Sequence, residues 1–180
     1  MLDFSNNYFE LFGLPESYGI DQNALATQYR ELQTRLHPDR YANATDHERR
    51  LAVQGAAYVN EAFDTLKDSH LRARYLLGLR GVEFNEEMDT TADPEFLMQQ
   101  LELREALEEV RGQEDPLARL DELGDEAQQW HASLSGAFAE HYARERLDEA
   151  REVVLKMQFF RRLRQEIARL QESLEDELLD

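Results

Sequence analysis

The amino-acid sequence predicts an all-α protein with two helical parts. Over most of the chain, apolar residues recur at intervals of three and four, the spacing of one face of an α-helix. The helix-start patterns "TDHE" at 45–48 and "DPEF" at 93–96 precede two of these stretches. No stretch predicts a strand. We therefore expect a helical hairpin with short flanking helices, followed by an antiparallel bundle of three helices.

Four helices are expected in the first part. A short one lies around 8–12, and a second begins after Asp21, which can cap it, and ends at Pro38. A third begins after Thr45 and pairs with the second, and a closing helix lies around 69–77. The second helix carries one apolar stripe: Leu25, Tyr29, Leu32 and Leu36.

Three long helices are expected in the second part. Asp93 caps the first, and Gly112 ends it. "DP" at 115–116 begins the second, whose apolar side is formed by Leu117, Leu120, Leu123, Ala127, Trp130, Leu134 and Phe138. The third starts near Arg144, and its stripe is formed by Leu147, Ala150, Val154, Met157, Phe160, Leu163, Ile167, Leu170 and Leu174.

The segment 82–92 breaks the helical periodicity and coincides with a change in charge. Residues 1–80 hold 9 basic and 11 acidic side chains, whereas 81–180 hold 11 and 27. We expect one domain at 1–81, a linker at 82–92 and a second domain at 93–180. Two halves with such different charge are expected to meet different partners.

Composition excludes several classes of function. The net charge of −18 argues against nucleic-acid binding, which depends on cationic contacts to phosphate. No apolar run is long enough to span a membrane, and the acidic start is unlike a signal peptide, so a cytoplasmic protein is expected. The absence of cysteine excludes disulfides, thiol nucleophiles and thiolate metal sites.

The sequence offers no catalytic constellation. It contains no nucleophile elbow, no phosphate-binding glycine loop and no HExxH motif, and "HERRL" at 47–51 lacks a second histidine. The proline between His37 and Asp39 makes a catalytic pair difficult to form. We expect a protein that is not an enzyme and has no cofactor and no metal site.

The tripeptide His37-Pro38-Asp39 interrupts an amphipathic helix. It could be a simple helix stop with solvated neighbours. With Tyr29 and Arg30 before it and "VNEAFDTLKDSHLRARY" at 59–75 after it, however, residues 4–78 resemble the J-domain, by which co-chaperones stimulate DnaK-type chaperone ATPases. The resemblance implies a chaperone-binding surface formed by His37, Pro38, Asp39, Tyr29, Arg30 and Arg35.

A rigid proline would display His37 and Asp39 outward from the helix pair. Asp39 could then accept charge-assisted hydrogen bonds from a chaperone arginine, while Arg30 and Arg35 meet an acidic surface. Ala26 and Glu31 dilute the basic run that J-domains often carry on this helix, so we expect weaker electrostatic attraction or a dedicated chaperone.

The first helix of the second part has two apolar faces. At 100° per residue, Phe96, Leu103, Leu107 and Val110 share the side assigned to the core. Leu97, Met98 and Leu101 fall on the opposite side among Glu102, Glu105 and Glu109. The helix could be buried on both sides, but unpaired carboxylates are costly to bury, which favours an exposed binding patch. Phe159, beside the stripe of the third helix, is expected to extend this patch.

"FLMQQLELREALEE" at 96–109 and "KMQFFRRLR" at 156–164 are similar to the C-terminal domain of the HscB family, J-type co-chaperones of iron–sulfur cluster assembly. The resemblance implies an HscA/DnaK-type chaperone and an IscU-type scaffold protein as partners. The alternative is a general J-protein that delivers unfolded chains. The implied scaffold-binding residues are Leu97, Met98, Leu101, Glu102, Glu105, Glu109 and Phe159.

Overall fold

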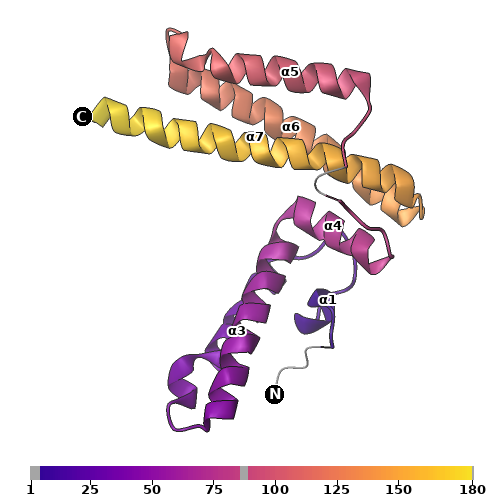
Figure 1. Ribbon diagram of the computed structural model, residues 1–180, viewed down its shortest axis with the longest axis vertical. Coiled ribbons are helices and arrows are strands. Elements are labelled where there is room, and N and C mark those ends of the chain that lie inside the picture. The colour runs from indigo at the N-terminus through magenta and orange to yellow at the C-terminus, as the bar shows by residue number, and fades with distance from the viewer. Residues whose placement is uncertain (1–4, 86–88, 180) are drawn as a thin grey trace. The chain divides into compact units, whose positions relative to one another are not determined.

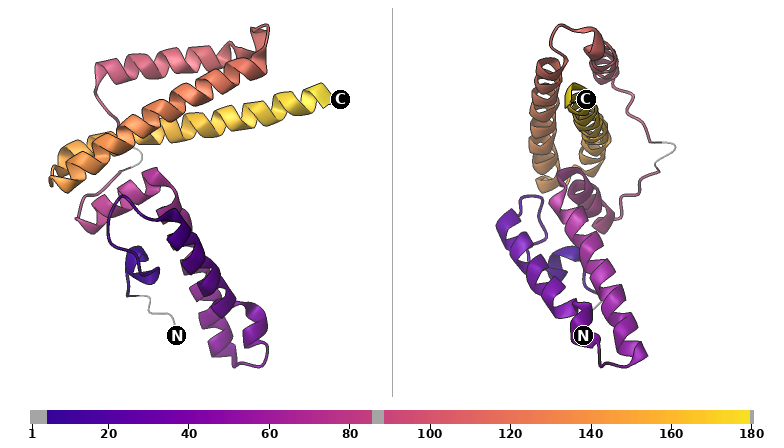
Figure 2. Two further views of the ribbon diagram at one scale, coloured as in Figure 1. Left: turned by 180° about the vertical axis from the view of Figure 1, so that it is seen from behind. Right: turned by 90° about the vertical axis from the view of Figure 1, so that its left-hand side faces the viewer.

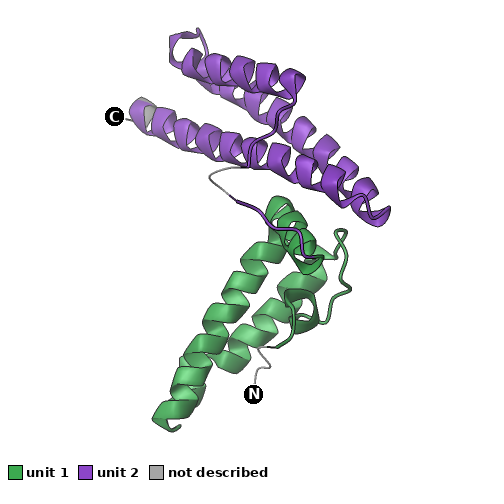
Figure 3. Cartoon of the chain, turned by 45° about the vertical axis from the view of Figure 1, so that its right-hand side comes forward, with its two compact units in different colours: residues 1–80 green, residues 81–180 purple. Residues whose placement is uncertain are grey.

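The computed structural model describes residues 5–85 and 89–179 and is all-helical within them (Figure 1). It contains two compact units, residues 1–80 and 81–180 (Figure 3). The all-α fold expected from the sequence is confirmed. Of the segment expected as a linker, residues 86–88 lie outside the described part of the chain.

The first unit is built around a helical hairpin. Its elements are α1 (Tyr8–Leu11), α2 (Gln22–Leu36), the 3₁₀ turn η1 (Pro38–Tyr41), α3 (Asp46–Lys67) and α4 (Ser69–Leu79). Figure 2 shows α2 lying beside α3. The expected caps are confirmed: the Asp21 carboxylate accepts hydrogen bonds from two amides of α2, and Thr45 forms a reciprocal capping box with Glu48.

Apolar side chains from α1, α2, α3 and α4 form the core of this unit. Phe9, Leu25, Val59 and Leu76 have no exposed surface. By contrast, η1 contributes no buried residue. The core therefore stabilises the hairpin, while the turn between its two helices stays at the surface.

The second unit contains α5 (Pro94–Glu108), the 3₁₀ turn η2 (Val110–Gly112), α6 (Pro116–Ala143) and α7 (Leu147–Leu179). Successive helices run in opposite directions, so α5 and α7 are parallel (Figure 1). The predicted core face of the first helix is confirmed by the burial of Phe96, Leu103 and Leu107 on α5, and it is continued by the buried Val110 of η2.

Two aromatic predictions in this unit are wrong. Phe159, expected to have an exposed ring, is only 9% exposed and belongs to the core between the helices. Trp130, expected in the core, is 39% exposed, and its neighbour His131 is buried instead. Because α7 packs against both α5 and α6, a wider arc of it is buried than a single stripe would suggest.

The described residues of the segment expected as a linker are attached to α7 of the same unit. Arg151 lies 2.5 Å from the carboxylate of Asp89 and donates a hydrogen bond to the backbone carbonyl of Glu83. Its guanidinium also lies over the Phe84 ring. These contacts hold the chain against α7 before α5 begins.

Candidate interaction surfaces

The His37-Pro38-Asp39 turn is displayed at the surface of the first unit. His37 is extended, with φ −58° and ψ 133°, as expected for a residue before proline. Pro38 begins η1, so the stretch is one 3₁₀ turn with an ordered backbone. The side chains of His37 and Asp39 are 59% and 92% exposed. Both are therefore open to a partner.

A local hydrogen bond determines which ring nitrogen of neutral His37 is the donor. Its Nδ1 accepts from the backbone amide of Asp39 at 3.3 Å, and the Asp39 carboxylate lies 3.6 Å from the same nitrogen. Since Nδ1 is the acceptor, the neutral ring carries its proton on Nε2. The turn therefore presents a donor at Nε2 and an exposed carboxylate that accepts hydrogen bonds.

Of the three residues predicted on α2, the structure brings two to the surface. Arg30 and Arg35 are exposed, and Arg30 Nε donates to the carbonyl of Ala26. Arg40, which directly follows the tripeptide, is also exposed and was missed by the sequence reasoning. Its position directly after the tripeptide is the sequence feature that could have identified Arg40 as a candidate binding residue. Arg35 and Arg40 thus place cationic side chains directly before and after the displayed turn in the sequence.

Tyr29 is directed into the hairpin rather than away from it. Its ring stacks on Phe63 of α3 with centroids 3.9 Å apart, and its hydroxyl donates to Asn60 at 2.9 Å. These contacts join α2 to α3. A direct role for Tyr29 in chaperone binding stays a prediction, and the geometry gives it a packing role.

The second candidate surface lies on α5. Leu97, Met98 and Leu101 are 46%, 63% and 55% exposed, which confirms the predicted outward face. Three exposed carboxylates share this face, and together these side chains form what we term the α5 patch: Leu97, Met98, Leu101, Glu102, Glu105 and Glu109. Exposed apolar groups rimmed by charge are typical of protein interaction sites.

Phe159 lies beneath the edge of the α5 patch. Its ring meets that of Phe96 edge to face, with centroids 5.8 Å apart, and the Arg104 guanidinium lies 5.8 Å from its centroid. Its small exposed edge lines a hollow together with Leu97. Phe159 therefore belongs mainly to the core and contributes little surface of its own beside Leu97.

One ion pair anchors the start of α5. The Asp93 carboxylate caps the helix by accepting from the amides of Glu95 and Phe96, and it lies 2.5 Å from Lys156 Nζ of α7. The hydrogen bond from Lys156, followed by the backbone hydrogen bond from Phe96, lowers the pKa of the Asp93 carboxyl. The cap was visible in the sequence, whereas its partner lies 63 residues away. This link helps to fix which face of α5 points outward.

Over the part of the chain that the structure describes, no group of three or more His, Asp or Glu side chains could hold a metal ion. No described helix is long and apolar enough to cross a membrane. What both surfaces offer is exposed side chains for contact with other proteins.

Known proteins resemble this chain over nearly its whole length. A co-chaperone protein HscB homolog of Shewanella baltica is 42% identical, covering 94% of this chain and 99% of the relative. The solved chaperone HscB from Vibrio cholerae superimposes with a TM-score of 0.83 at 40% identity, covering 94% of this chain and 99% of its own. The human co-chaperone HscB reaches the same TM-score at 27% identity, covering 92% of this chain and 82% of its own.

A family model described as the HSCB C-terminal oligomerisation domain matches residues 92–168. These similarities and the two helical units define a co-chaperone, a protein with no catalytic activity of its own. Within this class, the chain belongs to the HscB family.

Proposed function

We propose that this co-chaperone stimulates the ATPase of an HscA/DnaK-type chaperone and delivers an IscU-type iron–sulfur scaffold protein to it. The observation that carries the proposal is the presence of two exposed surfaces on separate units. The His37-Pro38-Asp39 turn offers hydrogen-bonding groups with adjacent arginines, and the α5 patch offers apolar side chains rimmed by acid. Each unit thus offers a surface to a different partner.

The chemistry of the turn suits an ATPase partner. The Asp39 carboxylate is 92% exposed, so it can accept a charge-assisted hydrogen bond without first losing a partner from a buried pair. Arg30 and Arg35 would steer an acidic chaperone surface toward the turn. Because the turn contributes nothing to the core, its side chains can serve binding alone.

The α5 patch suits a folded partner with a defined surface. Its three large apolar side chains can act as central anchors, while its glutamates set orientation and the rate of encounter. A general J-protein for unfolded chains would instead need a broad and adaptable apolar surface. The narrow patch with an acidic rim favours a specific scaffold.

Measurement of chaperone ATP turnover tests this function. Turnover is measured for HscA with and without this protein and with IscU as scaffold. His37→Gln should abolish the stimulation, whereas His47→Gln, which changes an exposed histidine of α3 in the same unit, should leave it intact. Equal stimulation by wild type and His37→Gln would contradict the chaperone role.

A binding experiment separates the scaffold from unfolded clients. Immobilised protein is offered folded IscU and, separately, a denatured client protein. Capture of folded IscU, weakened by Leu97→Ala with Leu101→Ala, supports the scaffold role. Preferential capture of the denatured protein would favour the general J-protein.

A further inference from the structure

A hollow of about 250 Å³ lies beside the α5 patch, between the first half of α5 and the middle of α7. Leu97 and Phe159 provide apolar lining. Gln100, Arg104, Gln158 and Arg162 provide polar lining. Leu97 belongs to both the α5 patch and this hollow, so a partner seated on the patch would reach the hollow without leaving α5.

The hollow is lined by positively charged side chains, although it lies in the acidic half of the chain. Among the described residues, neither Arg104 nor Arg162 has a carboxylate within ion-pair distance. Asp89 also lines the hollow, but its carboxylate is neutralised by Arg151 at 2.5 Å. Acidic side chains outnumber basic ones 27 to 11 between residues 81 and 180, yet this one hollow is lined by two arginines that have no carboxylate partner in the described part of the chain.

Arg104 is also held in place. Its guanidinium lies 5.8 Å from the centroid of the Phe159 ring, a cation–π contact that keeps the group over the apolar lining. Because the guanidinium of Arg104 is already positioned there, less conformational entropy is lost when its N–H groups bind a carboxylate. An apolar lining beneath it would partly exclude water from such a contact.

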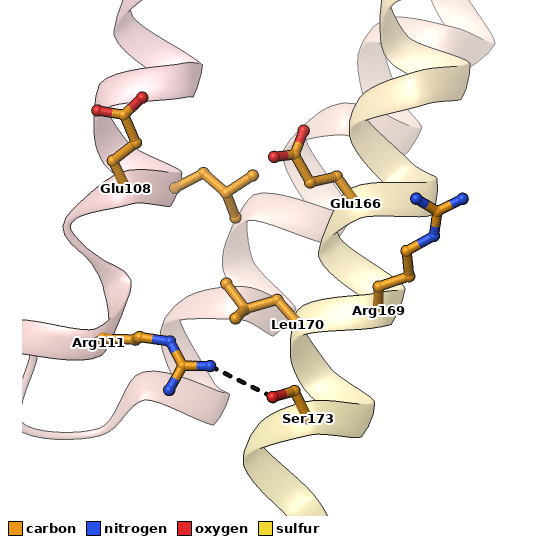
Figure 4. A pocket seen from close by; sticks show the side chains of 7 residues that line it. Glu108, Arg111, Glu166, Arg169, Leu170 and Ser173 are labelled. Carbon is orange, nitrogen blue, oxygen red and sulfur yellow. Dashed lines mark hydrogen bonds between the residues drawn. The ribbon is translucent and has the colours of Figure 1, made fainter.

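A second hollow farther along α5 and α7 provides a contrast (Figure 4). Its arginine on the α5 side, Arg111, is occupied: it lies 3.0 Å from the Glu177 carboxylate and donates to Ser173. Figure 4 shows Glu108 and Glu166 on the two sides of this hollow. With carboxylates of its own, the second hollow does not offer the uncompensated positive charge of the first.

We propose that the hollow between Arg104 and Arg162 receives an acidic side chain of the scaffold, an aspartate or glutamate next to the apolar residues that cover Leu97. This inference rests on the proposed scaffold-binding function and adds the chemistry of the contact. The scaffold would meet an acidic rim on one side of the apolar anchors and a cationic hollow on the other. Such a pairing of opposite charges fixes the orientation of a partner.

Calorimetric titration of IscU into protein variants tests the proposal. The double change Arg104→Gln and Arg162→Gln should weaken binding about tenfold, because a charge-assisted hydrogen bond at an interface is lost. The affinity of this variant should also depend less on salt. The double change Arg164→Gln and Arg169→Gln removes the same charge from exposed positions on α7 and should leave the affinity within about twofold of wild type.

The experiment distinguishes a failure of the cationic-hollow proposal from a failure of the scaffold-binding function. Binding of IscU to wild type, weakened by Leu101→Ala, would support the scaffold function. If the Arg104/Arg162 variant then binds IscU as tightly as wild type or the Arg164/Arg169 control, the cationic hollow is refuted and the scaffold function stands. If wild type does not bind IscU, both are refuted. Should the double variant unfold early in a thermal melt, Arg162→Gln alone replaces it, since that side chain is exposed, and an unchanged affinity then refutes the proposal.

Discussion

The free energy of unfolding of the second unit should distinguish Phe159 from the α5 patch. The Phe159 side chain is 9% exposed, and its ring packs edge to face against Phe96 and Phe160, with centroids 5.8 and 5.1 Å away. Phe159→Ala loses about 2 kcal/mol of transfer free energy and about 1 kcal/mol of aromatic pairing. We expect a loss of about 3 kcal/mol, at the low end for a buried phenylalanine, because water can enter the adjacent hollow.

Leu101 provides the matched control on the same surface. It is 55% exposed, so less than half of its area is removed from water in the folded state. Leu101→Ala should therefore cost less than about 1 kcal/mol of stability, and the better helix propensity of alanine offsets part of this loss. Binding of the scaffold should fall in this variant while the fold survives.

Urea unfolding followed by tryptophan fluorescence measures both changes. The chain has one tryptophan, Trp130, which lies in the second unit and stacks on Phe160 with centroids 6.1 Å apart. Its emission therefore reports the packing of this unit. If Phe159→Ala shifts the free energy of unfolding no more than Leu101→Ala does, the assignment of Phe159 to the core is refuted.

Three further outcomes follow from local contacts. As the pH falls below about 4, the ordinary range of an aspartate, the protection of the amides at the start of α5 against hydrogen exchange, taken relative to the intrinsic exchange rate at each pH, should fall, because the pKa of Asp93 is lowered mainly by the hydrogen bond from Lys156 and the stabilisation is lost when the carboxylate is protonated. Asp93→Asn should abolish this pH dependence of the protection, and a protection factor that does not change with pH in wild type would contradict it. Thr45→Ala removes the α3 cap and should lower the stability of the first unit by about 1 kcal/mol, measured by hydrogen exchange of the α3 amides. Unchanged protection of these amides would show that the cap does not stabilise the helix. Replacing Arg30 and Arg35 by alanine should weaken chaperone association and reduce its salt dependence, and an unaltered salt dependence would exclude these residues from the docking face.

Much of the fold could be predicted because its signals are local. Asp21, Thr45 and Asp93 cap helices through amides two or three residues away, so the cap and its target are read together in the sequence. The core stripe of α5 and its exposed face were likewise predictable. A helical wheel shows which side chains share a side, and here the carboxylates marked the side that faces water.

Only the tertiary structure decided which residues become buried when a helix packs against two other helices instead of one. Periodicity places residues around the axis of one helix, but it does not say how wide an arc other helices will cover. Because α7 packs on both α6 and α5, Phe159 is buried, whereas Trp130 of α6 stays partly exposed although its ring stacks on Phe160 of α7.

Pairs that are distant in the chain were equally invisible in the sequence. Lys156 finds Asp93 across 63 residues, and Arg162 on α7 shares a hollow with Arg104 on α5. Such contacts depend on the relative rotation and offset of packed helices, which the side chains of all three helices determine together. The sequence by itself therefore determined where helices begin and which faces are apolar, while packing between them decided which charges meet.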